Sequence, residues 1–257
     1  MSKQQNGRTV SGEKPRINYP DGSGLQRPFD LPRNQLSLLL VFVIAAAIIG
    51  GIFLFQTYDS VVNGKAHEAA ALEENINKPI SLDLPVLANL MILDDATIET
   101  GFTDAGLITY RFGAANEYVG GLDLIKLPAD ISLADAGVAY TTGIDKLSAS
   151  NAAKYLNGSW RLMVDRGEYI DMRVKYADFV SADPATALQT TLVSEGIDPA
   201  TAGEIATDEA GNTFYAGTFD TGDTPYKWKA SACSLSDIYR IDGLPSTALY
   251  IVFRMYQ

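Results

Sequence analysis

The sequence predicts an α+β protein in which a single N-terminal transmembrane helix is followed by an extracytoplasmic domain with short helices and a mainly antiparallel β-sheet. Two observations support this prediction. The run from Leu36 to Phe55 is apolar and uncharged, and as a helix it would extend about 30 Å, the thickness of a bilayer's hydrocarbon core. After residue 159, apolar and polar residues alternate in several short segments, which is typical of strands with one solvated face.

The two flanks of the apolar run carry charge of opposite sign. Before it, six basic and three acidic residues give a net charge of +3, whereas after it 14 basic and 28 acidic residues give −14. Because positive flanks stay inside, we expect a cytoplasmic N-terminus and a C-terminal domain outside the cell membrane. A cleaved signal peptide is the alternative. It is disfavoured because the apolar run is long and the only acceptable cleavage site, Gly64-Lys65-Ala66, lies well beyond it.

These features divide the chain into four predicted parts. Residues 1–34 are polar and rich in Gly, Pro, Asn and Gln, so we expect a disordered cytoplasmic tail. Residues 35–57 form the transmembrane helix, which contacts the lipid bilayer. Residues 58–78 continue it as a stalk helix that ends at Pro79, because proline cannot continue a helix. Residues 79–257 form the extracytoplasmic domain, whose stability depends on its core because a single cysteine cannot form an internal disulfide.

The first part of the domain is predicted to contain a helix and two weak strands. Asp83 would cap the helix, and Asp94-Asp95 would end it. Residues 107–112 and 122–127 are short apolar segments bounded by glycines or a proline, which favours strands.

Two further helices are indicated by their terminal residues. Ser132 would cap one helix that Gly143 ends, since glycine readily adopts the left-handed conformation at a helix end. Ser148 would begin another, which stops at Asn157-Gly158.

The second part of the domain is predicted to hold most of the sheet. Residues 160–165 and 170–176 alternate around a turn and indicate a hairpin. Residues 249–256 are apolar on both faces except at Arg254, which favours a central strand. Between these strands, Asp183-Pro184 would open a helix that Gly196 closes, with three residues directed inward, namely Leu188, Leu192 and Val193.

The residue inventory argues against several kinds of catalysis. His67, the only histidine, lies in the predicted stalk, so a nucleophile that depends on histidine is not expected in the domain. Zinc sites rely on histidine and cysteine, and the only cysteine is Cys233. No phosphate-binding loop occurs. We therefore expect no catalytic residue, cofactor or metal, although abundant acids such as Asp94-Asp95 and Asp208-Glu209 leave carboxylate chemistry open.

Four basic residues are candidates for binding an anion or a partner. Arg173 and Lys175 lie two residues apart in one predicted strand, and Lys227 and Lys229 do so in another. Side chains at this spacing leave the same face of a strand, so a shared sheet would carry a positive stripe in an acidic domain. The alternative is that the four are an ordinary solvated face, paired with Asp171 and other acids.

The function expected from these observations is that of a membrane-anchored extracytoplasmic binding protein. We expect a non-catalytic component of a cell-envelope assembly, with another envelope protein or an anionic surface as partner and no nucleic acid. One alternative is a hydrolase of envelope polymers that uses carboxylates, and another is an accessory sensor. A deep cleft lined by two or more acids would favour the hydrolase, whereas a shallow sheet face would favour binding.

Overall fold

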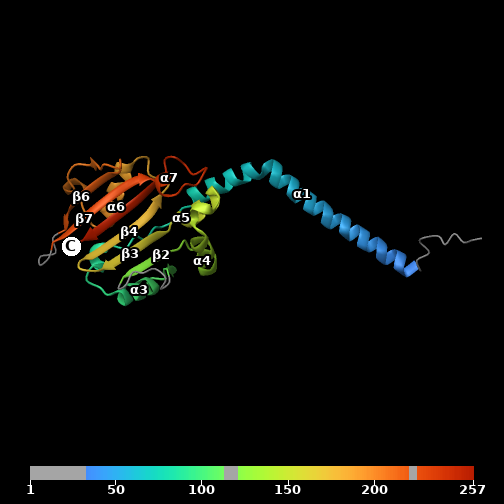
Figure 1. The fold of residues 1–257 in the computed structure, drawn as a ribbon, viewed down its shortest axis with the longest axis horizontal. Coiled ribbons are helices and arrows are strands. Elements are labelled where there is room, and N and C mark those ends of the chain that lie inside the picture. Colours follow the sequence, from blue (N-terminus) through green and yellow to red (C-terminus); the bar gives the residue numbers. More distant parts are fainter. Residues whose placement is uncertain (1–32, 113–120, 220–224) are drawn as a thin grey trace, which may run out of the picture. The chain divides into compact units, whose positions relative to one another are not determined.

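The computed structural model describes residues 33–112, 121–219 and 225–257 (Figure 1). The chain forms two compact units that divide after Val61. The predicted tail, residues 1–34, lies outside the described residues except for its last two, which belong to the first helix.

Helix α1 (Arg33–Asn77) contains the whole apolar run. By length and composition it is able to cross a membrane, and its large apolar side chains from Leu40 to Phe55 are exposed. Among the residues that the structure describes, this surface has no packing partner, and it is compatible with a lipid environment. The helix ends immediately before Lys78-Pro79, the position that the sequence predicted.

The second unit, residues 62–257, is built on one antiparallel sheet with the strand order β1-β2-β3-β4-β8-β7-β6-β5. The predicted hairpin is formed by β3 and β4, and β8 lies in the middle of the sheet, as its apolar faces indicated. The strands are β1 (Thr109–Arg111), β2 (Leu122–Lys126), β3 (Trp160–Arg166), β4 (Ile170–Asp178), β5 (Ala206–Thr207), β6 (Thr213–Phe219), β7 (Tyr226–Ser234) and β8 (Leu249–Tyr256).

Short helices connect the strands and cover parts of the sheet (Figure 1). The α-helices after α1 are α2 (Leu87–Leu90), α3 (Asp95–Asp104), α4 (Leu133–Thr142), α5 (Ala149–Leu156), α6 (Pro184–Ser194) and α7 (Leu235–Ile238), and two 3-10 turns are η1 (Ile144–Lys146) and η2 (Pro199–Thr201). The mixture of helix and antiparallel sheet agrees with the predicted α+β class.

The two faces of the sheet differ in cover. On the inner face, residues such as Trp160, Val174 and Phe253 form the main core with α6, which contributes the buried Leu188 and Leu192. The outer face is covered at one end, where α4, η1, α5 and α7 pack around Ala177. Successive side chains of a strand point to opposite faces, so the difference in cover between the two faces explains why apolar and polar residues alternate in the sequence.

Helix termini confirm some predictions and correct others. Ser132 caps α4 by accepting a hydrogen bond from the N–H of Asp135, and Gly143 ends this helix with a φ of +103°. Ser148 caps α5, which ends at Leu156. Val193, however, is exposed, because it lies one position beyond Leu192 and is therefore rotated by about 100° away from the core.

The predicted roles of Asp83 and Asp94-Asp95 are wrong. Asp83 has a φ of +48°, whereas an N-cap residue needs extended backbone, and α2 begins only at Leu87 without a side-chain cap. Asp94 begins a helix instead of ending one, because its carboxylate accepts a hydrogen bond of 2.7 Å from the N–H of Thr97 and caps α3. Asp95 follows in the first turn, where a negative charge is favourable.

The second unit begins inside the predicted stalk. The carboxylate of Glu68 accepts hydrogen bonds from the backbone N–H and the hydroxyl of Ser150, both at 2.8 Å, at the start of α5. Leu72 packs against the core cluster beneath α5. At the other end of α5, the side-chain amide of Asn157 donates to the carbonyl oxygen of Asn75 at 2.7 Å. Residues on the N-terminal side of the predicted border at residues 78–79 therefore pack against the domain.

Candidate functional site

The four predicted basic residues lie on the outer face of the sheet, two on each side of β8. Arg173 of β4 is directly opposite Arg254 of β8, which is in turn opposite Lys229 of β7. Three bases thus form a row across three neighbouring strands, with Lys175 and Lys227 on the same face. Arg254, the only charged residue of β8, completes this row and was not among the predicted site residues.

Acidic and aromatic side chains contact the bases of this row. Asp171 lies within 2.6 Å of both Arg173 and Arg254. Burial raises the pKa of this carboxyl, but hydrogen bonds from the two arginines outweigh burial and hold the pKa below its ordinary value. Lys229 lies 3.5 Å from Asp208 and 4.2 Å from the ring centre of Phe214. The alternative interpretation, in which these bases pair with acids on a solvated face, thus accounts for part of the positive charge of the row.

A groove with a volume of about 530 Å³ follows this row. Its lining has more positive than negative side chains, because four bases and one acid, Asp237, contribute to it. Lys227 shares the face but does not line the groove. The lining consists of Arg173, Lys175, Ala210, Asn212, Lys229, Ser231, Ala232, Cys233, Asp237, Ile238, Tyr250, Val252 and Arg254.

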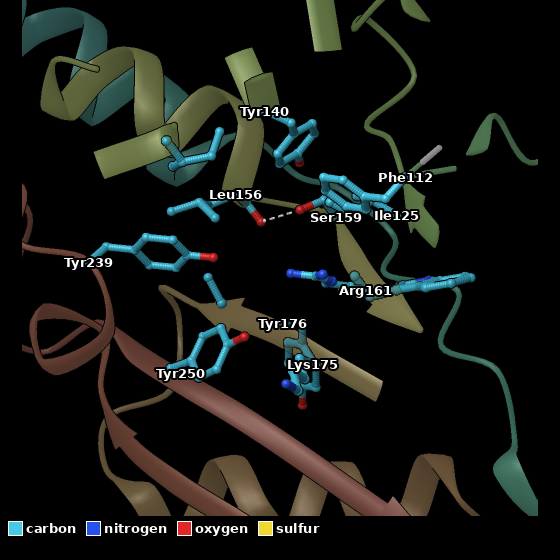
Figure 2. A pocket seen from close by; sticks show the side chains of 13 residues that line it. Phe112, Ile125, Tyr140, Leu156, Ser159, Arg161, Lys175, Tyr176, Tyr239 and Tyr250 are labelled. Atoms are coloured by element: carbon cyan, nitrogen blue, oxygen red, sulfur yellow. Dashed lines mark hydrogen bonds between the residues drawn. The ribbon is translucent and has the colours of Figure 1, made fainter. Parts of the chain in front are cut away.

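A smaller pocket of about 200 Å³ lies where helices cover the end of the outer face (Figure 2). Four tyrosines line it, and Arg161 points toward the same space. Lys175 and Tyr250 line both the pocket and the groove, so the two cavities are neighbours. The lining consists of Phe112, Ile125, Tyr140, Ile144, Leu156, Ser159, Trp160, Arg161, Lys175, Tyr176, Ala177, Tyr239 and Tyr250.

Arg161 is fixed by two contacts. Its Nε and Nη2 donate to the two carboxylate oxygens of the buried Asp123, at 2.8 and 2.6 Å. The guanidinium also lies 4.7 Å from the ring centre of Phe112. The hydrogen bonds that Arg161 donates to Asp123 raise the pKa of Arg161, which therefore stays charged. Its Nη1 forms no hydrogen bond with any residue that the structure describes.

Lys175 stands between the cavities without an acidic partner. Its ammonium group forms no ion pair or hydrogen bond within the described part of the chain. Burial lowers the pKa of Lys175, and the nearby charges of Arg161 and Arg173 lower it further, by more than those of Asp123 and Asp171 raise it. A half-buried charge next to two other positive charges is unfavourable for stability.

The tyrosines of the pocket keep their protons. Burial raises the pKa of Tyr140, Tyr239 and Tyr250 above the ordinary value. Their hydroxyl groups therefore remain able to donate hydrogen bonds at neutral pH. Tyr140 and Tyr239 come from segments about 100 residues apart, and no spacing in the sequence indicated that they would meet.

The acids that left carboxylate chemistry open serve as caps and turn residues. Asp94 caps α3, and the carboxylate of Asp208 accepts hydrogen bonds from the N–H groups of Ala210 and Asn212. Within the described ranges, no three residues among His, Cys, Asp and Glu gather as metal ligands would. Cys233, on β7, is half-buried, and burial raises the pKa of its thiol.

Comparisons of the chain with known protein families, with curated proteins and with solved structures found no match. The function is therefore argued from the cavities on the outer face. These cavities combine positive charge, hydroxyl donors and apolar walls, which suits the binding of an anion.

Proposed function

We propose that the protein is a single-pass membrane protein whose extracytoplasmic domain binds an anionic partner in a cell-envelope assembly. The apolar α1 serves as the anchor, and the charges of +3 before it and −14 after it orient the N-terminus toward the cytoplasm. The single observation that carries the binding role is the groove, where four bases gather in a chain of net charge −11.

Binding explains the groove better than hydrolysis does. A carboxylate that acts as a general acid needs a raised pKa, whereas Asp171, at the centre of the basic row, has its pKa lowered by two arginines. Asp123 is likewise occupied by Arg161. The basic side chains above these carboxylates are arranged to attract negative charge.

A pair of substitutions in the groove tests the proposal. In Arg254→Gln/Lys229→Gln the positive row is reduced to Arg173, and we expect binding of inorganic polyphosphate to weaken at least tenfold. The matched control is Lys227→Gln, which removes a charge from the same face outside the groove. Binding to the full-length, detergent-solubilised chain is measured by microscale thermophoresis at low and high salt, because contacts between exposed charges weaken with ionic strength.

Co-purification from solubilised membranes provides the second measurement. A protein retained by the wild type and by Lys227→Gln, but lost with the double variant, would be the anionic partner. Equal polyphosphate binding by the wild type and the double variant would contradict the proposal, as would binding that salt leaves unchanged.

A further inference from the structure

We infer that the tyrosine-lined pocket binds a small organic monoanion, a carboxylate carried on a single ring or a short apolar body. This inference rests on the proposed function, because Lys175 and Tyr250 connect the pocket to the anion-binding groove. The volume of about 200 Å³ equals the share of about seven water molecules in the liquid, so the ligand is compact.

The charges around the pocket select an anion with one negative charge. Arg161 and Lys175 are its two cations, and no acidic side chain in the described ranges lines it. Asp123, just outside the lining, already balances Arg161 through two hydrogen bonds. Lys175 forms no ion pair within the described ranges, and the Nη1 of Arg161 supplies an additional donor. A carboxylate satisfies both, whereas a doubly charged phosphate would bring excess negative charge.

The walls of the pocket select an apolar body for this anion. Phe112, Ile125, Ile144 and Leu156 provide aliphatic and aromatic surface, and the tyrosine rings provide flat faces. Hydroxyl groups of Tyr239 and Tyr250 point toward the centre of the space (Figure 2). A few directed polar groups in an otherwise apolar lining are the usual composition of a small-molecule site.

The position of Lys175 is costly for the empty domain, which supports a role in binding. Its charge is half-buried, and the nearby Arg161 and Arg173 repel it more than the nearby Asp123 and Asp171 attract it. A bound carboxylate would remove this cost by pairing with the ammonium group. Residues that destabilise the empty protein and are compensated by a ligand are characteristic of binding sites. We therefore expect Lys175→Met, which keeps an unbranched apolar side chain without the charge, to raise the melting temperature in the absence of ligand.

Calorimetric titration of the full-length, detergent-solubilised protein with benzoate tests the inference. We expect saturable binding to the wild type and at least tenfold weaker binding to Lys175→Met. Lys227→Met is the matched control, because it removes a lysine from the same sheet face away from the pocket, and its affinity should equal that of the wild type. Benzyl alcohol, which lacks the charge, and inorganic phosphate, which lacks the apolar body, should each bind at least tenfold more weakly than benzoate.

A second variant keeps the test decisive if Lys175→Met does not fold. Tyr239→Phe removes only a hydroxyl donor and should weaken benzoate binding about tenfold, the value of one hydrogen bond to a charged group. The inference is overturned if benzoate shows no saturable binding up to about 10 mM, or if benzyl alcohol binds as well. It is also overturned if all folded pocket variants bind benzoate like the wild type.

The groove variant Arg254→Gln/Lys229→Gln separates this inference from the proposed function. Its benzoate affinity should remain that of the wild type, because neither residue lines the pocket. Benzoate binding without polyphosphate binding would leave the pocket standing and refute the groove as an anion site. Polyphosphate binding without benzoate binding would refute the pocket alone.

Discussion

Glu195 is the most heavily perturbed acid that the structure describes. It follows the last residue of α6, with 2% of its surface exposed. One carboxylate oxygen accepts a hydrogen bond of 2.8 Å from the N–H of Leu87, and the other has no hydrogen-bond partner among the described residues. Burial raises the pKa of Glu195 to about 8, against the lowering effect of the bond from Leu87. The carboxyl group is therefore mostly protonated at neutral pH.

This raised pKa predicts that the domain loses stability as the pH rises. Between about 4.5 and about 8, the folded protein keeps the proton of Glu195 whereas the unfolded chain releases it. The contribution of Glu195 to the free energy of unfolding is therefore complete below about pH 4.5. It decreases by at most about 1.4 kcal/mol for each pH unit up to about 8. Glu195→Gln should abolish this dependence and raise the melting temperature at pH 8. Thermal unfolding at several pH values checks it, with the exposed Glu209→Gln as control. A wild-type melting temperature that is constant across this window would contradict the prediction.

The sequence predicted the placement of the basic residues but not of Glu195. Side chains two apart in a strand share a face whatever the strand pairs with, so Arg173 with Lys175 and Lys227 with Lys229 followed from alternation alone. Glu195 lies beyond the regular helix, just before Gly196, where no period fixes the direction of a side chain. Its burial depends on α2, which is distant in the sequence.

At the scale of the elements, strands were easier to predict than their neighbours. The hairpin of β3 and β4 is local, and its alternation and turn made it recognisable. The pairing of β4 with β8 and of β8 with β7 joins segments up to about 80 residues apart, and only packing decides it. The row of Arg173, Arg254 and Lys229 depends on this pairing. So does the pocket, whose tyrosines come from α4, β4, β8 and the segment after α7.

The contact between α1 and α5 gives a prediction at the same scale. Glu68 satisfies the N–H of Ser150 and adds a negative charge at the start of a helix, which is favourable. Glu68→Ala should lower the free energy of unfolding of the second unit by about 1 kcal/mol, as the loss of a helix cap does. Thermal unfolding measures the loss, and Glu73→Ala on the same helix serves as control. Equal melting temperatures for Glu68→Ala and the wild type would show that the contact does not stabilise the domain.

At the scale of the whole molecule, the division of the chain by packing differs from the division by sequence pattern. Helical continuity and Pro79 suggested a stalk that ends before the domain begins. The second unit instead includes residues from Val62 onward, because Leu72 and Asn75 contact α5 and its surroundings. Propensity and proline placement determine where a helix ends, but only tertiary packing determines which part of it belongs to a domain.

This difference predicts the behaviour of two soluble fragments. Residues 62–257 should form a cooperatively folding monomer without the apolar part of α1, and reductant should leave its melting temperature unchanged because the chain has one cysteine. Residues 78–257 lose the contacts of Glu68, Leu72 and Asn75 with the region of α5, and this exposes part of its core cluster. Full burial of a leucine contributes about 2 kcal/mol, and Leu72 is partly buried, so the loss of its contact together with those of Glu68 and Asn75 should make the shorter fragment melt several degrees lower. Calorimetry on both fragments, with Glu68→Ala in the longer one as an intermediate case, measures the difference. If both melt at the same temperature, residues 62–77 are a stalk that merely touches the domain.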